Sequence, residues 1–96
     1  MSKIIDDAVA ALKEKMSNTS FEGSAKFEIE TEGSIVIIGG SVYASDDPAD
    51  VTFTASVEIF EKIFNGELEP TAAFMTGKLK IDGDMGTAMR LANVFS

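Results

Sequence analysis

Apolar and polar positions along the chain follow two different periods, and the changes of period mark the predicted elements. Residues 2–16 place apolar side chains at helical spacing and charged ones on the other side, which predicts an amphipathic helix with one buried stripe. Residues 24–30 and 50–56 alternate at every second position, so each predicts a strand with one buried and one wet face. Residues 35–38 are apolar on both faces, which predicts a central strand or one covered on both sides.

Short turn signals separate these strands. Gly39-Gly40 predicts a two-residue hairpin that leads into a short strand over residues 41–45. A polar corner at residues 46–50 contains Pro48 and leads into the next strand. Strands joined by such short connections predict an antiparallel meander.

The second half of the chain returns to helical spacing. Ser56 is a predicted N-cap, and the helix that it begins ends at Asn65-Gly66. A second, short helix begins near Pro70, a residue suited to a first helical position, and it stops at Gly77.

A last strand and a last helix complete the pattern. Leu79 and Ile81 share one face of the strand, and the helix over residues 85–95 is apolar over much of its circumference. The predicted order is therefore helix, four strands, two helices, strand and helix. Because alternating strands leave one sheet face wet, the helices must cover the other face. This predicts a single α+β two-layer domain over residues 1–96.

The 96 residues carry a net charge of −8, and the acids are unevenly spread. Residues 21–70 contain eleven acids and two lysines, whereas residues 71–96 contain two acids, two lysines and one arginine. Nucleic acid is not an expected partner, because affinity for phosphate depends on Lys and Arg. The slightly basic C-terminal quarter predicts at most transient contact with an anionic membrane.

Absent residue types restrict the possible chemistry. The chain has no cysteine and no histidine, which excludes disulfides, thiol catalysis and the usual proton shuttle at neutral pH. Catalysis would have to rest on carboxylates, Lys, Arg or Tyr43, and most of the acids lie on predicted wet faces. Neither an enzyme activity nor a cofactor is therefore predicted.

The first helix also bears on the location of the protein. Asp6 and Asp7 fall where a signal peptide would need its apolar region. No stretch approaches the about 18 apolar residues of a membrane span. These features predict a cytoplasmic protein.

The acidic corner "DGDMG" at residues 82–86 has the start of a calcium-binding loop. Asp82 and Asp84 fit the first and third ligand positions of an EF-type loop. The fifth, sixth and twelfth positions do not fit, since they hold Gly86, Thr87 and Asn93. We therefore predict a turn at Gly83, an N-cap at Asp84 and no metal site. The same solvated interpretation covers the acids that flank the polar corner, Asp46, Asp47 and Asp50.

Large apolar side chains gather in the elements of the C-terminal half. They are Phe60, Ile63, Phe64, Phe74, Met75, Met85, Met89 and Phe95. A Met and Phe stripe at helical spacing is more often ordinary core, which the residues alone favour. Methionine is also flexible and polarizable, so the same residues could form an adaptable wall around an apolar ligand.

Residues 70–95 resemble the most characteristic segment of sterol carrier protein 2 (SCP2) domains. In that family a G-K-[LM]-[KR]-[IV]-x-G-[DN] strand and corner lead into a Met-rich last helix. The matching positions here are Gly77, Lys78, Leu79, Lys80, Ile81, Gly83, Asp84 and Met85. The resemblance is more specific over residues 49–95 than before them, and it identifies the chain as similar to a short, stand-alone, bacterial-type member.

The resemblance implies a five-stranded, mostly antiparallel sheet with helices packed on one face. It also implies a hydrophobic tunnel between the two layers that holds fatty acids, acyl-CoA, phospholipids or sterols without catalysing a reaction. By position, the implied ligand-binding residues are Phe60, Ile63, Phe64, Phe74, Met75, Thr76, Leu79, Ile81, Met85, Met89, Ala92 and Phe95.

Two departures from the family pattern change the expected ligand. Many members carry Gln just before the G-K-L strand, where Thr76 offers a shorter hydroxyl. The sequence ends at Ser96, whereas members often continue past the last helix. An open or smaller tunnel mouth favours a single fatty-acyl chain over a sterol.

Two classes of function remain open at this point. A lipid carrier is expected to copurify with lipid as a monomer or weak homodimer. A protein-interaction or accessory module, for instance in lipid or isoprenoid-quinone metabolism, is expected to have a filled core.

Overall fold

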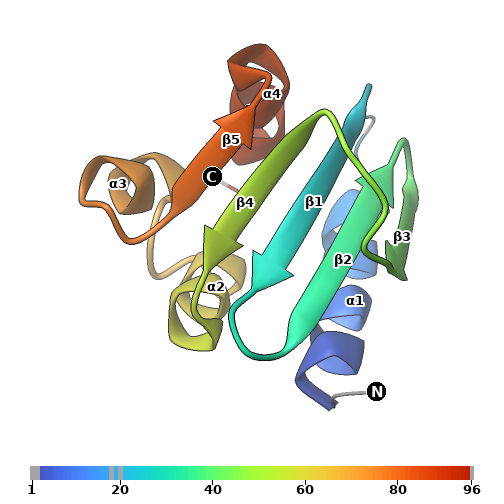
Figure 1. Ribbon diagram of the computed structural model, residues 1–96, viewed down its shortest axis with the longest axis horizontal. Helices are drawn as coiled ribbons and strands as arrows, with labels where there is room; N and C mark the ends of the chain where they lie inside the picture. Colours follow the sequence, from blue (N-terminus) through green and yellow to red (C-terminus); the bar gives the residue numbers. More distant parts are fainter. Residues whose placement is uncertain (1–2, 18, 20, 96) are drawn as a thin grey trace.

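The computed structural model describes residues 3–17, 19 and 21–95, with the backbone alone for Phe95. The elements along the chain are α1 (Lys3–Met16), β1 (Ser24–Ile29), β2 (Gly33–Ile38), β3 (Ser41–Ala44), β4 (Val51–Ala55), α2 (Val57–Phe64), α3 (Pro70–Met75), β5 (Lys80–Gly83) and α4 (Met85–Phe95) (Figure 1). The predicted order of helices and strands is confirmed.

The sheet has five strands in the order β3-β2-β1-β4-β5 and is mostly antiparallel. The predicted meander is correct for β1, β2 and β3 but wrong for β4, which pairs parallel to β1. The reason lies at the start of the two strands. The Ser24 backbone N–H donates to an Asp50 carboxylate oxygen at 3.1 Å, and the Asp50 N–H donates to the Ser24 hydroxyl at 2.9 Å. These reciprocal bonds hold the two strand starts side by side.

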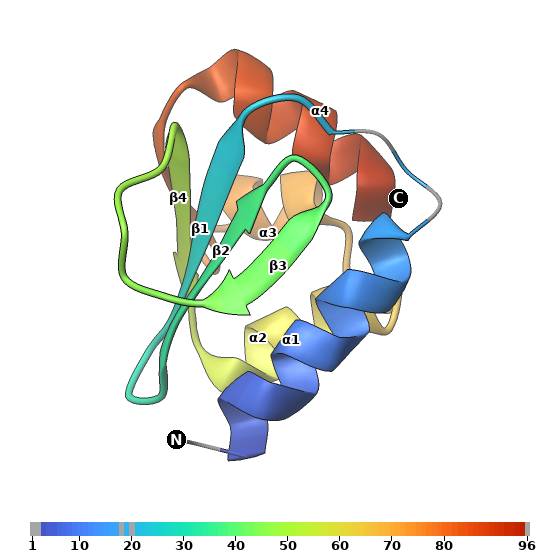
Figure 2. The same cartoon turned by 90° about the vertical axis from the view of Figure 1, so that its right-hand side faces the viewer.

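The helices lie on one face of the sheet (Figure 2). The parallel register sets Ala25, Phe27 and Ile29 beside Val51, Phe53 and Ala55, and all six side chains are buried under the helices. The helix α1 adds one buried stripe to this core, formed by Ile5, Ala8, Leu12 and Met16. The α+β two-layer architecture is therefore confirmed, with the core between the sheet and the helices.

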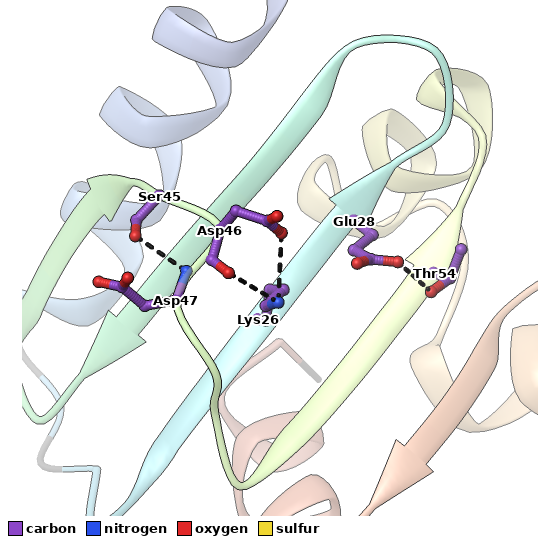
Figure 3. A network of polar contacts seen from close by, with 6 residues as sticks. All are labelled: Lys26, Glu28, Ser45, Asp46, Asp47 and Thr54. Atoms are coloured by element: carbon purple, nitrogen blue, oxygen red, sulfur yellow. Dashed lines mark hydrogen bonds and ion pairs between the residues drawn. The ribbon is translucent and has the colours of Figure 1, made fainter.

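The opposite sheet face is partly covered by the connection from β3 to β4. Val36 on this face is fully buried, so the prediction of a strand covered on both sides is confirmed. The Lys26 side chain is only 12% exposed, and its ammonium lies 3.2 Å from the Asp46 carbonyl and 3.3 Å from the Asp46 carboxylate (Figure 3). Thr54 donates to Glu28 at 3.4 Å on the same face. Asp46 and Asp50 are therefore not merely solvated, because both fasten the connection to β1.

Helix ends follow the predicted capping chemistry. The Ser56 hydroxyl accepts from the Ile59 N–H at 3.3 Å at the start of α2. At the start of α4, the Asp84 carboxylate accepts from the Thr87 N–H at 3.3 Å and from the Thr87 hydroxyl. Gly83, at φ 118°, lets this corner approach β4, since a Cβ there would lie 2.9 Å from the Val51 Cα. The approach allows the Asp84 N–H to donate to the Asp50 carbonyl at 3.0 Å.

Candidate functional site

An apolar groove of about 190 Å³ lies between α1 and α2 and is floored by the end of β1. Its apolar lining consists of Ile4, Ala8, Ala11, Ile29, Val57, Phe60 and Phe64, and its polar lining of Asp7, Glu61 and Asn65. Burial of an apolar guest is the chemistry that such a lining supports.

Residue size explains why the two helices leave a gap. On α1, Ala8 and Ala11 face the groove, so this side of the helix carries little volume. The bulkier Ile5 and Leu12 of the same helix are buried in the core instead. On α2, residues at helical spacing present Val57, Phe60 and Phe64 to the same groove. The small side chains of Ala8 and Ala11 therefore leave space opposite the Phe60 and Phe64 rings.

A second apolar space lies deeper, between the sheet and α2, α3 and α4, but it measures only about 10 Å³. Its lining is Phe27, Phe53, Phe60, Ile63, Phe64, Pro70, Leu79, Leu91 and Ala92. A space of this size holds at most about one water molecule. It is a seam in a packed core, and Phe60 and Phe64 line both this seam and the outer groove.

The rings that separate the two spaces belong to one aromatic cluster. Phe60 and Phe64 stack with centroids 5.8 Å apart and an interplanar angle of 24°. Phe27 meets Phe60 edge-on at 5.6 Å and Phe64 edge-on at 6.1 Å, and it lies 5.2 Å from Phe53. These offset and edge-to-face geometries are favourable for aromatic pairs. The cluster is therefore a well-packed partition rather than a loose one.

The structure brings some of the implied ligand-binding residues together. Phe60, Ile63, Phe64, Leu79 and Ala92 line one or both spaces, and Ile81 packs against the core beside them. Phe60, Ile63 and Leu79 are buried. As ligand contacts, all of these residues stay predictions.

Other implied residues lie away from both spaces. Phe74, Met75, Met85 and Met89 are exposed, Met75 by 79%. On α3, Pro70 and Ala73 are buried, which turns Phe74 and Met75 outward. On α4, Thr87, Ala88 and Leu91 are the buried residues, and Met85 and Met89 lie on the exposed side. The Thr76 hydroxyl donates to the Ala72 carbonyl at 2.9 Å. The side chain of Phe95 lies outside the described residues.

Sequence reasoning missed the α1 side of the groove. Ile4, Ala8 and Ala11 belong to the helix that was predicted only as core packing. The available signal was the pair of alanines on the inner side of an amphipathic helix, opposite an aromatic stripe. Small residues facing large ones leave room where two large stripes would interlock.

The Asp84 corner has perturbed electrostatics but lies elsewhere. The pKa of Asp84 is lowered, first by the hydrogen bond from the Thr87 hydroxyl and then by the bond from the Thr87 N–H. Across residues 3–17, 19 and 21–95, no group of three or more His, Cys, Asp or Glu could hold a metal ion. Nor is any helix in the described part of the chain long and apolar enough to cross a bilayer.

Comparison with known proteins gives matches that agree with this fold. A family model described as the SCP-2 sterol transfer family matches residues 5–96. The solution structure of the sterol carrier protein domain 2 of Helicoverpa armigera is similar, with a TM-score of 0.80 and 31% identity over 96% of this chain and 85% of that one. The solution structure of palmitated SCP2L2 from Aedes aegypti has a TM-score of 0.74 and 25% identity, over 99% of this chain and 95% of that one.

A longer relative matches over a shorter segment. Hydroxysteroid dehydrogenase-like protein 2 of Bos taurus is 48% identical over 50 residues, which make up 52% of this chain and 12% of that protein. The chain thus matches only a small part of that relative. The family model, in contrast, covers residues 5–96, which include the whole sheet and nearly all of the helices and groove lining, and so this chain belongs to the SCP-2 sterol transfer family.

Proposed function

We propose that this chain binds and carries one long-chain lipid without catalysing a reaction on it. The observation that carries the proposal is the apolar groove between α1 and α2 in a chain that belongs to the SCP-2 family. The palmitated relative from Aedes aegypti supports a fatty-acyl chain as the guest. Fatty acid, fatty acyl-CoA and phospholipid all carry such a chain, and each suits the narrow groove better than a sterol.

A long chain needs more room than the groove provides. Ligand pockets usually measure about 300–1,000 Å³, and the groove measures about 190 Å³. Rotation of the Phe60 and Phe64 rings would join the groove to the seam behind them, because both rings line both spaces. The tunnel is thus opened by the guest, which gains about 0.8 kcal/mol for each methylene it buries.

The carrier acts in the cytoplasm as a monomer or weak homodimer, needs no cofactor, and contacts membranes only transiently. Its charge of −8 disfavours prolonged contact with anionic lipid.

Native mass spectrometry of freshly purified protein, followed by solvent extraction and lipid analysis, tests the proposal. We expect one fatty acid or phospholipid for each monomer, and the length of its chain would measure the opened tunnel. A lipid-free protein that also shows no mass shift after incubation with oleate or oleyl alcohol would refute the carrier.

A protein-interaction module is the second candidate, and specific observations favour it. The inner seam is nearly filled at about 10 Å³. Phe74, Met75, Met85 and Met89 are exposed on α3 and α4. Light scattering coupled to size-exclusion chromatography separates the candidates, because a module that docks a second copy through these side chains would show more than one chain, whereas the carrier stays mainly monomeric.

A further inference from the structure

We propose that the exposed side of α3 and α4 docks this protein on an anionic lipid bilayer, where the carrier takes up or delivers its guest. The inference rests on the proposed function and names the surface that makes the transient membrane contact. The side chains involved line neither the groove nor the seam.

Four large apolar side chains are exposed on this side of the molecule. They are Phe74 and Met75 on α3 and Met85 and Met89 on α4. The two helices contact each other and lie by β5, which forms one edge of the sheet (Figure 1). Met85 and Met89 are one helical turn apart, so they share the exposed side of α4. Exposed apolar residues that gather on neighbouring elements mark an interaction site.

Two cations accompany these side chains. The Lys78 N–H donates to the Ala73 carbonyl at 2.9 Å, so the turn after α3 folds back and holds Lys78 at the end of that helix. Arg90 directly follows Met89 and is exposed, and its guanidinium donates to the Thr87 hydroxyl at 3.0 Å. Among the described residues, neither cation forms a salt bridge. The α3–α4 surface is defined by these two cations and the four apolar side chains.

Acids are scarce on the α3–α4 surface. Of the sixteen acids in the chain, residues 71–96 contain only Asp82 and Asp84. Asp82 pairs with Thr52 in the sheet, on the face opposite the helices. Asp84 accepts from the Thr87 N–H and hydroxyl at the start of α4. Neither carboxylate therefore neutralises Lys78.

The acids of the rest of the chain are separated from this surface. Glu69 precedes α3, at the opposite end of that helix from Met75. The molecule measures 31 × 27 × 24 Å, and the Debye length at physiological salt is about 8 Å. Acids on the far side of the molecule are therefore largely screened. The α3–α4 surface presents local positive charge although the net charge of the chain is −8.

This combination fits a bilayer better than a second protein chain. An anionic bilayer offers phosphate groups to Lys and Arg, and hydrocarbon just below them to Met and Phe. A two-fold contact with a second copy would instead bring Lys78 and Arg90 toward the same cations of the partner. A partner helix usually docks into a groove, whereas the four apolar side chains line neither measured space.

Vesicles of equal parts phosphatidylcholine and phosphatidylglycerol test the docking surface, with binding measured by co-sedimentation at physiological salt. We expect the wild-type protein to bind them at least about fivefold more tightly than vesicles of phosphatidylcholine alone. The double variant Met75→Gln/Lys78→Gln should bind the anionic vesicles at least about tenfold more weakly. Its affinity for oleyl alcohol should stay within about twofold of wild type, since both residues are exposed and line neither space.

A matched control places the same kinds of change on the other face of the sheet. Ile38 is 46% exposed and follows Val36 by two positions on β2, so both lie on the face opposite the helices. Lys80 is exposed and pairs with Thr54, which lies on that face as well. The variant Ile38→Gln/Lys80→Gln also removes one exposed apolar side chain and one lysine. It should bind the anionic vesicles within about twofold of wild type.

The outcomes separate the docking surface from the carrier. If the wild-type protein binds oleyl alcohol but no anionic vesicles, or if both double variants lose vesicle binding equally or not at all, the docking surface is wrong and the carrier stands. A wild-type dimer that Met75→Gln/Lys78→Gln converts to a monomer would show that a second copy covers the surface, which also overturns the docking. If the wild-type protein does not bind oleyl alcohol, the carrier is wrong and the delivery of a guest falls with it.

Discussion

The Phe60–Phe64 ring pair has a wide groove on one side and a nearly closed seam on the other. On the outer side they face Ala8 and Ala11 of α1 across a groove of about 190 Å³. On the inner side they face larger groups, including Leu91, across a seam of about 10 Å³. The aromatic surface is alike on both sides, but the partners differ in size. Whether an apolar stripe becomes core or binding site is therefore decided by the element that packs against it.

We therefore expect the inner side of the ring pair to determine stability and the outer side to determine affinity for a ligand. Substitutions on each side should separate these two properties.

The largest expected effect is on the inner side, from Leu91→Ala. Leu91 is fully buried and lines the seam, so truncation leaves a cavity that its packed neighbours fill only partly. We expect a loss of about 2–5 kcal/mol in the free energy of unfolding, measured by urea denaturation. Ile4→Ala, at an exposed residue on the edge of the groove, is the control and should lower the free energy of unfolding clearly less. Equal losses would mean that the outer side is core as well.

The next effect is on the outer side, from Ala11→Phe. A ring at this position occupies the groove and displaces at least two methylenes of a guest, at about 0.8 kcal/mol each. We expect affinity for oleyl alcohol to fall at least about tenfold, while the urea midpoint changes little. Ala10→Phe places the same ring on the exposed side of α1 and should leave affinity unchanged. Equal affinity in both variants would place the lipid elsewhere.

A smaller effect on stability is expected at the start of α4, where Asp84 caps the helix that carries Leu91. Because the folded state lowers the Asp84 pKa from 3.8, the carboxylate stabilises the fold above that pH, and the stabilisation is lost as the pH falls through the lower folded value. We expect Asp84→Asn to lower the melting temperature at pH 7, and the difference from wild type to shrink as the pH is lowered below 3.8. Asp82→Asn, two residues earlier, is the control. A difference that does not change with pH would show that the charge is not involved.

The smallest effect should come from Met75→Gln. Met75 is 79% exposed and lines neither space. Surface substitutions of this kind usually change stability by less than about 0.5 kcal/mol, and we expect an equally small change in affinity for oleyl alcohol. A clear loss of lipid affinity, measured beside Ala11→Phe, would extend the site to α3, as the family resemblance implies.

The sequence was sufficient to predict the helices and strands, but not which elements pair or pack against one another. Period and capping residues located every helix and strand, because these signals are local, as the Ser56 and Asp84 caps illustrate. Alternation is the same in parallel and antiparallel strands, so it could not predict that β4 joins β1. The outward rotation of Phe74 and Met75 depends on what α3 buries, and a six-residue helix is too short for its apolar pattern to define a face.

Asp50 has a consequence for the rate and order of folding. Its side chain and N–H bind Ser24, 26 positions earlier, and its carbonyl accepts from Asp84 in the last quarter of the chain. Such distant contacts must first overcome the entropy of closing long loops, so they form late. Until they form, β1 is paired with β2 on one edge, while its other edge still lacks β4. An unpaired flank is a template for another chain, so this waiting period is when a newly made molecule is most exposed to misassembly.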